Sequence, residues 1–149
     1  MLEGKLRLAT VEGTGRQFVA QTAAGHAFVI DDGVGKTAPK PVDYVLLALG
    51  GCTAFDVIGI LRKKRHRVTR YEIEVKAEQH AEPPTVFTRV ELKHRLWGEI
   101  DPEAVKSAIH LSETKYCAVG AMIAKTAKIE VTFEILPDGD AGIPSEANS

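Results

Sequence analysis

Residues 41–64 read PVDYVLLALGGCTAFDVIGILRKK and carry the strongest helix signal in the chain. A proline suits the first helical turn, and Asp43 just behind it suits the positive end of the helix dipole. The apolar residues are not confined to one stripe, since Leu49 and Leu61 lie on different sides. A helix that is apolar all round is a buried helix. The sequence therefore predicts a buried helix that other elements, or a partner subunit, must cover.

Strands are predicted on both sides of this helix. Alternation and turn residues indicate short strands at residues 5–11, 17–22 and 26–30, with a turn at Gly13 and Gly15 and a loop over 31–40. Two longer alternating strands follow at 71–78 and 86–96.

The last third of the chain predicts two helices and a strand. Asp101-Pro102-Glu103 supplies an N-cap, a proline at the first helical position and early negative charge. This helix is expected to run to about Thr114, where Lys115-Tyr116 interrupts it. A short helix at 117–125 and a strand at 129–136 follow. The order predicts an α+β fold with a mainly antiparallel sheet.

Composition limits the classes of protein that fit. The 149 residues suit a single domain, expected over residues 1–136, with a loose tail at 137–149 that is rich in Gly, Pro, Asp and Ser. A net charge of −1 argues against a dedicated nucleic-acid or membrane-surface binder. The basic run at 62–67 suits a solvated helix end, with nucleic-acid binding as the alternative.

The expected location is the cytosol. The longest charge-free run, residues 44–55, is too short to span a bilayer. The first five residues have no apolar signal core.

Two cysteines, Cys52 and Cys117, are too few for a disulfide framework and too far apart in sequence for a CxxC motif. One interpretation is that both thiols are inert and buried in the core. The other is a redox pair, in which a peroxide oxidises one thiol to a sulfenic acid and the second condenses with it to a disulfide. Gly50 and Gly51 leave room beside Cys52 for close packing or for a small ligand. Cys117 stands near a predicted helix start, which favours its thiolate.

At this point the sequence resembles a known family. Residues 41–54, PVDYVLLALGGCTA, are similar to the first cysteine helix of the OsmC/Ohr family, and residues 115–119, KYCAV, to its second cysteine motif. The segments at Gly25-His26, Asp31 and residues 84–88 resemble the YhfA-like branch of the family. The resemblance covers about residues 13–134.

The resemblance implies an intertwined homodimer, with β-sheets around central helices and active sites at the subunit interface. It also implies reduction of organic hydroperoxides, with Cys52 as the peroxidatic thiol and Cys117 as the resolving thiol. An external dithiol would be the reductant, and no bound cofactor is expected. The alternatives are a redox-sensing or small-molecule-binding protein of the same fold without turnover, and an interaction module with inert thiols.

Two more site residues follow from the resemblance. The family usually places a glutamate and an arginine together near the reactive thiol. Asp43 stands at the acidic position, one methylene shorter, and Arg16 follows a glycine turn as the arginine does. A plain surface role for Arg16 is the alternative.

Further expectations concern other side chains. Asp56 lies one helical turn after Cys52, where an ionised carboxylate would raise the pKa of the thiol. We therefore expect Asp56 to hydrogen-bond elsewhere, to a sheet residue or toward a dimer partner. The five histidines have no metal-ligand spacing, so no metal site is predicted. The aromatic residues are expected mostly in the core, with some in a pocket wall: Phe18, Phe28, Phe55, Phe87 and Trp97.

Overall fold

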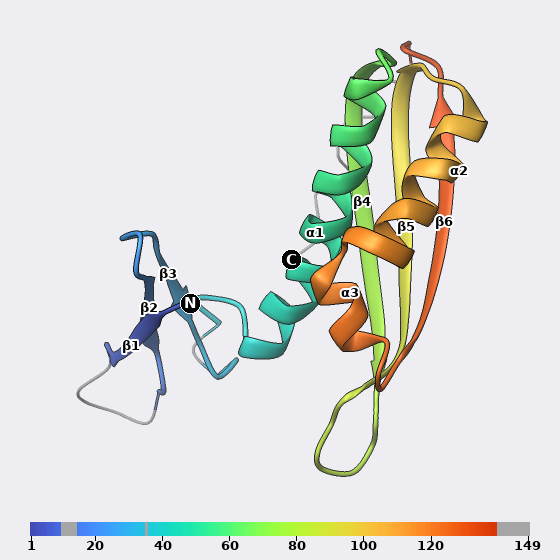
Figure 1. The fold of residues 1–149 in the computed structure, drawn as a ribbon. Helices are drawn as coiled ribbons and strands as arrows, with labels where there is room; N and C mark the ends of the chain where they lie inside the picture. Colours follow the sequence, from blue (N-terminus) through green and yellow to red (C-terminus); the bar gives the residue numbers. More distant parts are fainter. Residues whose placement is uncertain (10–14, 35, 140–149) are drawn as a thin grey trace. The chain divides into compact units, whose positions relative to one another are not determined.

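Residues 1–9, 15–34 and 36–139 are described by the structure, a computed structural model (Figure 1). The chain divides into two compact units, Met1–Leu47 and Ala48–Ser149. Each unit has its own three-stranded sheet. The long helix α1 (Pro41–Lys63) belongs to both units. The expectation of one domain over residues 1–136 stays a prediction, and residues 140–149 of the predicted tail lie outside the described residues.

The first unit contains an antiparallel sheet of β1 (Gly4–Leu8), β2 (Phe18–Thr22) and β3 (Ala27–Ile30) in that order. All three predicted strands are confirmed, although the first ends at Leu8. Gly25 has φ of +90° in the turn between β2 and β3, a conformation that favours glycine. The predicted turn residue Gly13 lies outside the described residues.

The loop before α1 is organised by acidic side chains. The buried Asp31 carboxylate accepts hydrogen bonds from the backbone N–H and the hydroxyl of Thr37, and these bonds lower the pKa of Asp31 to about 2. Asp43 Oδ2 accepts a hydrogen bond of 2.9 Å from the Lys40 backbone N–H. Asp43 thus stabilises the first turn of α1, as its place in the sequence predicts.

The second unit contains the rest of α1 and the remaining elements. In chain order they are β4 (Arg67–Gln79), β5 (Phe87–Glu99), α2 (Pro102–Leu111), the π-helical turn η1 (Ser112–Tyr116), α3 (Ala118–Ile123) and β6 (Lys128–Leu136). The strands and α-helices were each predicted. The helix expected to run to about Thr114 ends at Leu111, and the interruption expected at Lys115-Tyr116 is part of the π-helical turn. Asp101 is the N-cap of α2, and its side chain accepts from the Glu103 N–H.

The sheet of the second unit has the order β4-β5-β6 and is mixed. β4 and β5 pair antiparallel, whereas β5 and β6 pair parallel. The sequence predicted mainly antiparallel pairing, and this parallel pair is the exception to it. Its reason is the connection: the helices α2 and α3 carry the chain back to the starting end of the sheet before β6 begins.

One face of this sheet packs against helices α1 and α2, which lie beside each other over it (Figure 1). The core cluster joins α1, β5 and α2 through fully or nearly buried apolar side chains: Val57, Leu61, Leu96, Ala104, Val105, Ala108 and Ile109. Phe87 and Trp97 are buried as expected. Phe55 is 80% exposed and Phe28 is 41% exposed, so the core placement expected for most aromatic residues is wrong for both. Two helical positions turn Phe55 about 200° from the buried Thr53.

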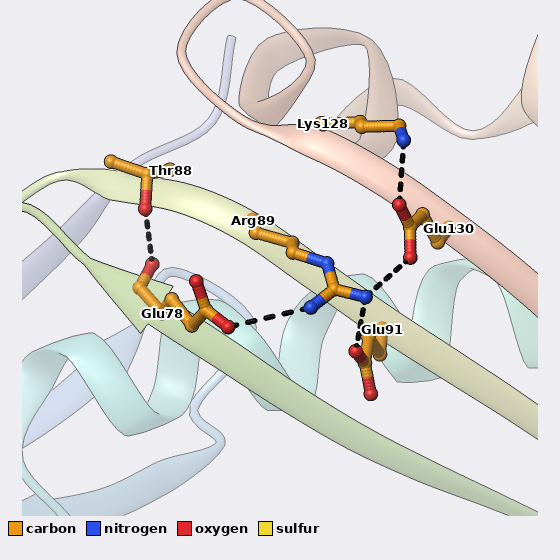
Figure 2. Close-up of polar contacts among 6 residues, drawn as sticks. All are labelled: Glu78, Thr88, Arg89, Glu91, Lys128 and Glu130. Carbon is orange, nitrogen blue, oxygen red and sulfur yellow. Dashed lines mark hydrogen bonds and ion pairs between the residues drawn. The ribbon is translucent and has the colours of Figure 1, made fainter.

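The other face of the sheet carries charged side chains, because strand residues alternate between the two faces. Arg89 on β5 lies among three carboxylates (Figure 2). Its guanidinium is 2.7 Å from both Glu91 and Glu130 and 3.4 Å from Glu78. Arg89 and the neighbouring Lys128 hold the pKa of Glu130 down at about 2. These pairs are partly exposed, so each contributes little to stability by itself.

Candidate functional site

The two cysteines lie close together in the second unit. Cys52 is on α1, and Cys117 caps the N-terminus of α3. The two sulfur atoms and a carboxylate oxygen of Asp56 all lie within 4.8 Å of one another. Both thiols are free, Cys52 half-buried and Cys117 only 5% exposed. Cys52 and Cys117 are 65 positions apart in the sequence, and the fold places them close together, as expected for a cysteine pair.

The π-helical turn determines where Cys117 lies. Its backbone N–H donates to the Ser112 carbonyl at 2.9 Å, the five-residue spacing of a π-helix. Directly afterwards, Cys117 Sγ accepts a hydrogen bond of 3.2 Å from the Gly120 N–H. A Cβ atom at position 120 would come within 3.1 Å of this sulfur, so the glycine permits the close contact.

Burial decides the protonation of Cys117. Removal from water, then hydrogen bonding with Cys52, raises the pKa of Cys117 to about 11. The charge of Asp56 acts in the same direction, and the Gly120 N–H opposes it. The sequence-based expectation that the helix start favours a Cys117 thiolate is therefore wrong. The hydrogen bond from the Gly120 N–H at the helix start lowers the pKa but does not offset burial.

Asp56 hydrogen-bonds away from the sulfurs, as expected, but its partner is neither on a sheet nor across an interface. The Ser112 hydroxyl donates to Asp56 Oδ2 at 2.8 Å and lies 3.2 Å from Thr53 Oγ1. Ser112 and Thr53 are buried polar residues. Neither residue was predicted as part of the site from the sequence. The only signal was the position of Thr53 beside Cys52, because Ser112 approaches from a distant segment.

The glycine pair beside Cys52 serves two different needs. A Cβ atom at position 50 would lie 2.8 Å from Val75 Cγ1, so Gly50 allows close packing of α1 on β4. Apart from the adjoining backbone of α1 itself, no described atom lies within 4 Å of a Cβ added at position 51. The packing alternative therefore applies to Gly50, and the open space is at Gly51.

A cavity of about 210 Å³ reaches the site from the side of Cys117. Its walls are largely apolar and include Leu49, Leu92, Ile129 and Val131. Among the described residues that line it, Cys117 is present and Cys52 is not. Phe55 and the other aromatic residues named from the sequence are also absent from this lining.

Arg16 and Asp43 lie in the first unit, where each has a local partner. Arg16 Nε is 3.1 Å from Asp32 Oδ2. Asp43 accepts from the Lys40 backbone, as described above. The expectation that these two residues assist Cys52 stays a prediction.

Among the histidines, His94 is fully buried and hydrogen-bonded, its Nδ1 lying 2.6 Å from the Tyr71 hydroxyl. The other four are exposed or half-buried: His26, His66, His80 and His110.

The fold and the paired thiols define an α+β protein whose two distant cysteines meet between a long apolar helix and a π-helical turn. The model of the family described as OsmC-like protein matches residues 33–132, and the chain belongs to this family.

Particular relatives agree with this assignment. The chain is similar to Protein YhfA of Escherichia coli strain K12, with 37% identity over 131 residues, 87% of this chain and 96% of that protein. Its structure is similar to that of a hypothetical protein from Aquifex aeolicus VF5, with 25% identity, a TM-score of 0.82 and coverage of 93% and 98%. An organic hydroperoxide resistance protein OsmC from Legionella pneumophila, 12% identical, shares the fold with a TM-score of 0.64 and coverage of 90% and 96%.

The family assignment also explains the apolar helix α1. By length and composition alone this helix could cross a membrane. In the OsmC-like fold it is the core helix, and its residues Leu49, Val57 and Leu61 are buried in the second unit.

Proposed function

We propose that this protein is a thiol-dependent peroxidase that reduces organic hydroperoxides in the cytoplasm. The observation that carries the proposal is the approach of Cys52 and Cys117 to within 4.8 Å, with unequal burial. The half-buried Cys52 is the thiol that an oxidant reaches more easily. Cys117 is the second thiol: it loses its proton as its sulfur attacks the sulfenic sulfur, and that proton leaves with the hydroxide as water.

The chemistry proceeds in three balanced steps. The Cys52 thiolate attacks the terminal peroxide oxygen, the O–O bond breaks, and a proton converts the leaving alkoxide to an alcohol. The sulfenic acid on Cys52 then condenses with the Cys117 thiol, which forms the disulfide and releases water. An external dithiol reduces the disulfide by exchange and is itself oxidised to a disulfide.

The apolar cavity supports an organic substrate. It reaches Cys117, whose sulfur lies within 4.8 Å of that of Cys52. Apolar walls favour an alkyl or aryl hydroperoxide over hydrogen peroxide, because only the organic substrate gains from apolar burial. The Legionella protein that shares this fold is an organic hydroperoxide resistance protein, which is consistent with this substrate class.

Turnover is measured with cumene hydroperoxide or hydrogen peroxide, a dithiol and a chelator. We expect Cys52→Ser to lose about 100-fold or more of the rate, because the nucleophile is gone. Cys117→Ser should still form one sulfenic acid per chain, trapped by dimedone, because its Cys52 is intact.

Turnover that survives in Cys52→Ser would contradict the assignment of roles. A wild-type protein without turnover would favour a redox-sensing or binding protein, an alternative suggested by the Asp56 carboxylate beside the thiols.

We also propose that the working protein is a homodimer. Leu47, Gly51, Phe55 and Gly59 follow one another at four-residue spacing, so they form a continuous stripe along α1 that turns by about 40° at each step. Leu47 and Phe55 are 55% and 80% exposed. Apart from the adjoining backbone of the helix itself, no described atom lies within 4 Å of a Cβ added at Gly51 or Gly59. Each glycine costs the helix roughly 1 kcal/mol, and within the described chain no close contact offsets this cost. A second copy packed on this face would use both the apolar side chains and the space.

Phe55→Glu tests the dimer by light scattering coupled to size exclusion. We expect wild type to elute as a dimer and Phe55→Glu to shift toward the monomer at the same concentration, because a buried unpaired carboxylate is costly. Phe55→Leu, which keeps the apolar contact, should remain dimeric. A monomeric wild type, or a dimer untouched by the glutamate, would contradict the use of this face.

A further inference from the structure

The cluster at Cys52, Asp56 and Cys117 has the composition of a metal site. Two sulfur atoms and one carboxylate oxygen, all within 4.8 Å of one another, come from three side chains that can each supply one ligand atom. Tetrahedral zinc sites bind thiolate sulfur at about 2.3 Å and carboxylate oxygen at about 2.0–2.2 Å. Ligand atoms around one such ion lie roughly 3.5–4 Å apart, so only a small closure of these three groups is needed.

The charge of the cluster also favours a cation. The three donor groups are two thiols, which give up their protons on binding a metal, and one carboxyl group. Within the described parts of the chain, the ion pairs do not include one between Asp56 and a lysine, arginine or histidine. A peroxidatic thiolate would be repelled by this carboxylate, whereas a divalent cation would be attracted by all three groups.

Neighbouring groups hold the ligands in place. The buried Ser112 hydroxyl donates to Asp56 Oδ2, which leaves Oδ1 for a metal. The Gly120 N–H donates to Cys117 Sγ and favours the charged sulfur. In metal sites, hydrogen bonds from neighbouring groups to the metal-binding side chains orient those side chains. The half-buried Cys52 and the cavity at Cys117 provide access.

We propose that the reduced cluster binds one Zn²⁺ per chain through Cys52 Sγ, Cys117 Sγ and a carboxylate oxygen of Asp56. Sulfur donors select zinc over magnesium or calcium. Three protein ligands leave the fourth position for water. Binding releases the two thiol protons to the solvent. A Cys52–Cys117 disulfide has no thiolate to offer, so oxidation of the pair and zinc binding exclude each other.

No metal site is predicted from the sequence, because the histidines lack ligand spacing and the two cysteines are 65 positions apart. The ligands proposed here are two cysteines and an aspartate from separate segments. Their spacing in sequence follows no recognised motif, and only the fold brings them together. The inference does not depend on peroxidase turnover, since it needs only the reduced thiols.

The test is an anaerobic titration of reduced, full-length protein with zinc chloride against a chromophoric zinc indicator. Cobalt chloride in a parallel titration reports sulfur ligation through its thiolate charge-transfer absorption. We expect one ion per chain in wild type, and affinity at least about 10-fold weaker in Cys52→Ser, Cys117→Ser and Asp56→Asn. Glu82→Gln is the control, because this exposed residue lies between β4 and β5, outside the cluster and the cavity lining, and the variant should bind zinc as wild type does.

Oxidised wild type provides a second test that needs no substitution. Protein with its thiols oxidised to the disulfide should not compete with the indicator, and reduction should restore binding. Circular dichroism establishes that each variant is folded, and Asp56→Ser replaces any Asp56→Asn protein that is not. Absence of binding by reduced wild type, or equal affinity in an Asp56 variant, would overturn the proposal. Because the titration contains no peroxide and the turnover assay contains a chelator, either proposal can fail without the other.

Discussion

Leu61→Ala should lower the free energy of unfolding by about 2–5 kcal/mol, the range for removing a large buried aliphatic side chain. Leu61 is fully buried where α1 meets α2 and β5. Its neighbours in the cluster include Val105 and Leu96, which are also fully buried. A truncation here leaves a cavity that three elements surround, so the site can collapse only in part.

Urea unfolding followed by circular dichroism measures this cost. Leu2→Ala is the matched control, because Leu2 is fully exposed, and it should change the free energy by no more than about 0.5 kcal/mol. A loss below about 1 kcal/mol for Leu61→Ala would mean that the contact between α1 and α2 contributes little to stability.

Acidification from pH 7 to about pH 4 should remove up to about 3 kcal/mol of stability through His94 alone. Burial lowers the pKa of His94 from 6.5 to about 4. Between these two values the unfolded chain binds a proton that the folded protein does not. Each pH unit in this window therefore costs about 1.36 kcal/mol, and stability is greatest above pH 6.5.

The surroundings of His94 explain why it stays neutral when folded. Its ring stacks beside Tyr71, with 5.8 Å between the ring centroids, and Nδ1 meets the tyrosine hydroxyl. Nε2 is buried and has no hydrogen-bond partner among the described residues. Burial also raises the pKa of Tyr71, so the phenol keeps its proton. A proton added to His94 would thus be a buried charge without a counter-ion.

Urea midpoints measured from pH 7.5 to 4.5 test this prediction. His94→Gln keeps an acceptor for the Tyr71 hydroxyl and has no titrating ring, so its profile should be flatter than that of wild type over this range. Carboxylates with a lowered pKa, such as Glu130, lose their stabilising effect mainly below pH 4.5. An equal slope in wild type and His94→Gln would assign the acid sensitivity to other groups.

The elements could be predicted from the sequence because their signals are local. The cap at Asp101, the proline at the start of α1 and the alternation in β4 and β5 each act within a few residues. The resemblance to the OsmC/Ohr family also joined Cys52 with Cys117, which composition and spacing by themselves left open between inert and paired thiols.

The contacts that control the site could not be predicted in this way. Asp56 meets Ser112 because α1 and the π-helical turn pack together, and 56 positions separate them. Burial by the surrounding elements raises the pKa of Cys117 and outweighs the helix start that favours its thiolate.

The order and type of the helices and strands thus follow from the sequence, because hydrophobic periodicity, caps and turn residues act over short range. The parallel pairing of β5 with β6, the exposure of Phe55 and the contact of Asp56 with Ser112 arise from tertiary packing. These three features depend on which apolar surfaces are buried against each other. Such burial joins segments that are far apart in the chain, so no short-range sequence pattern encodes it.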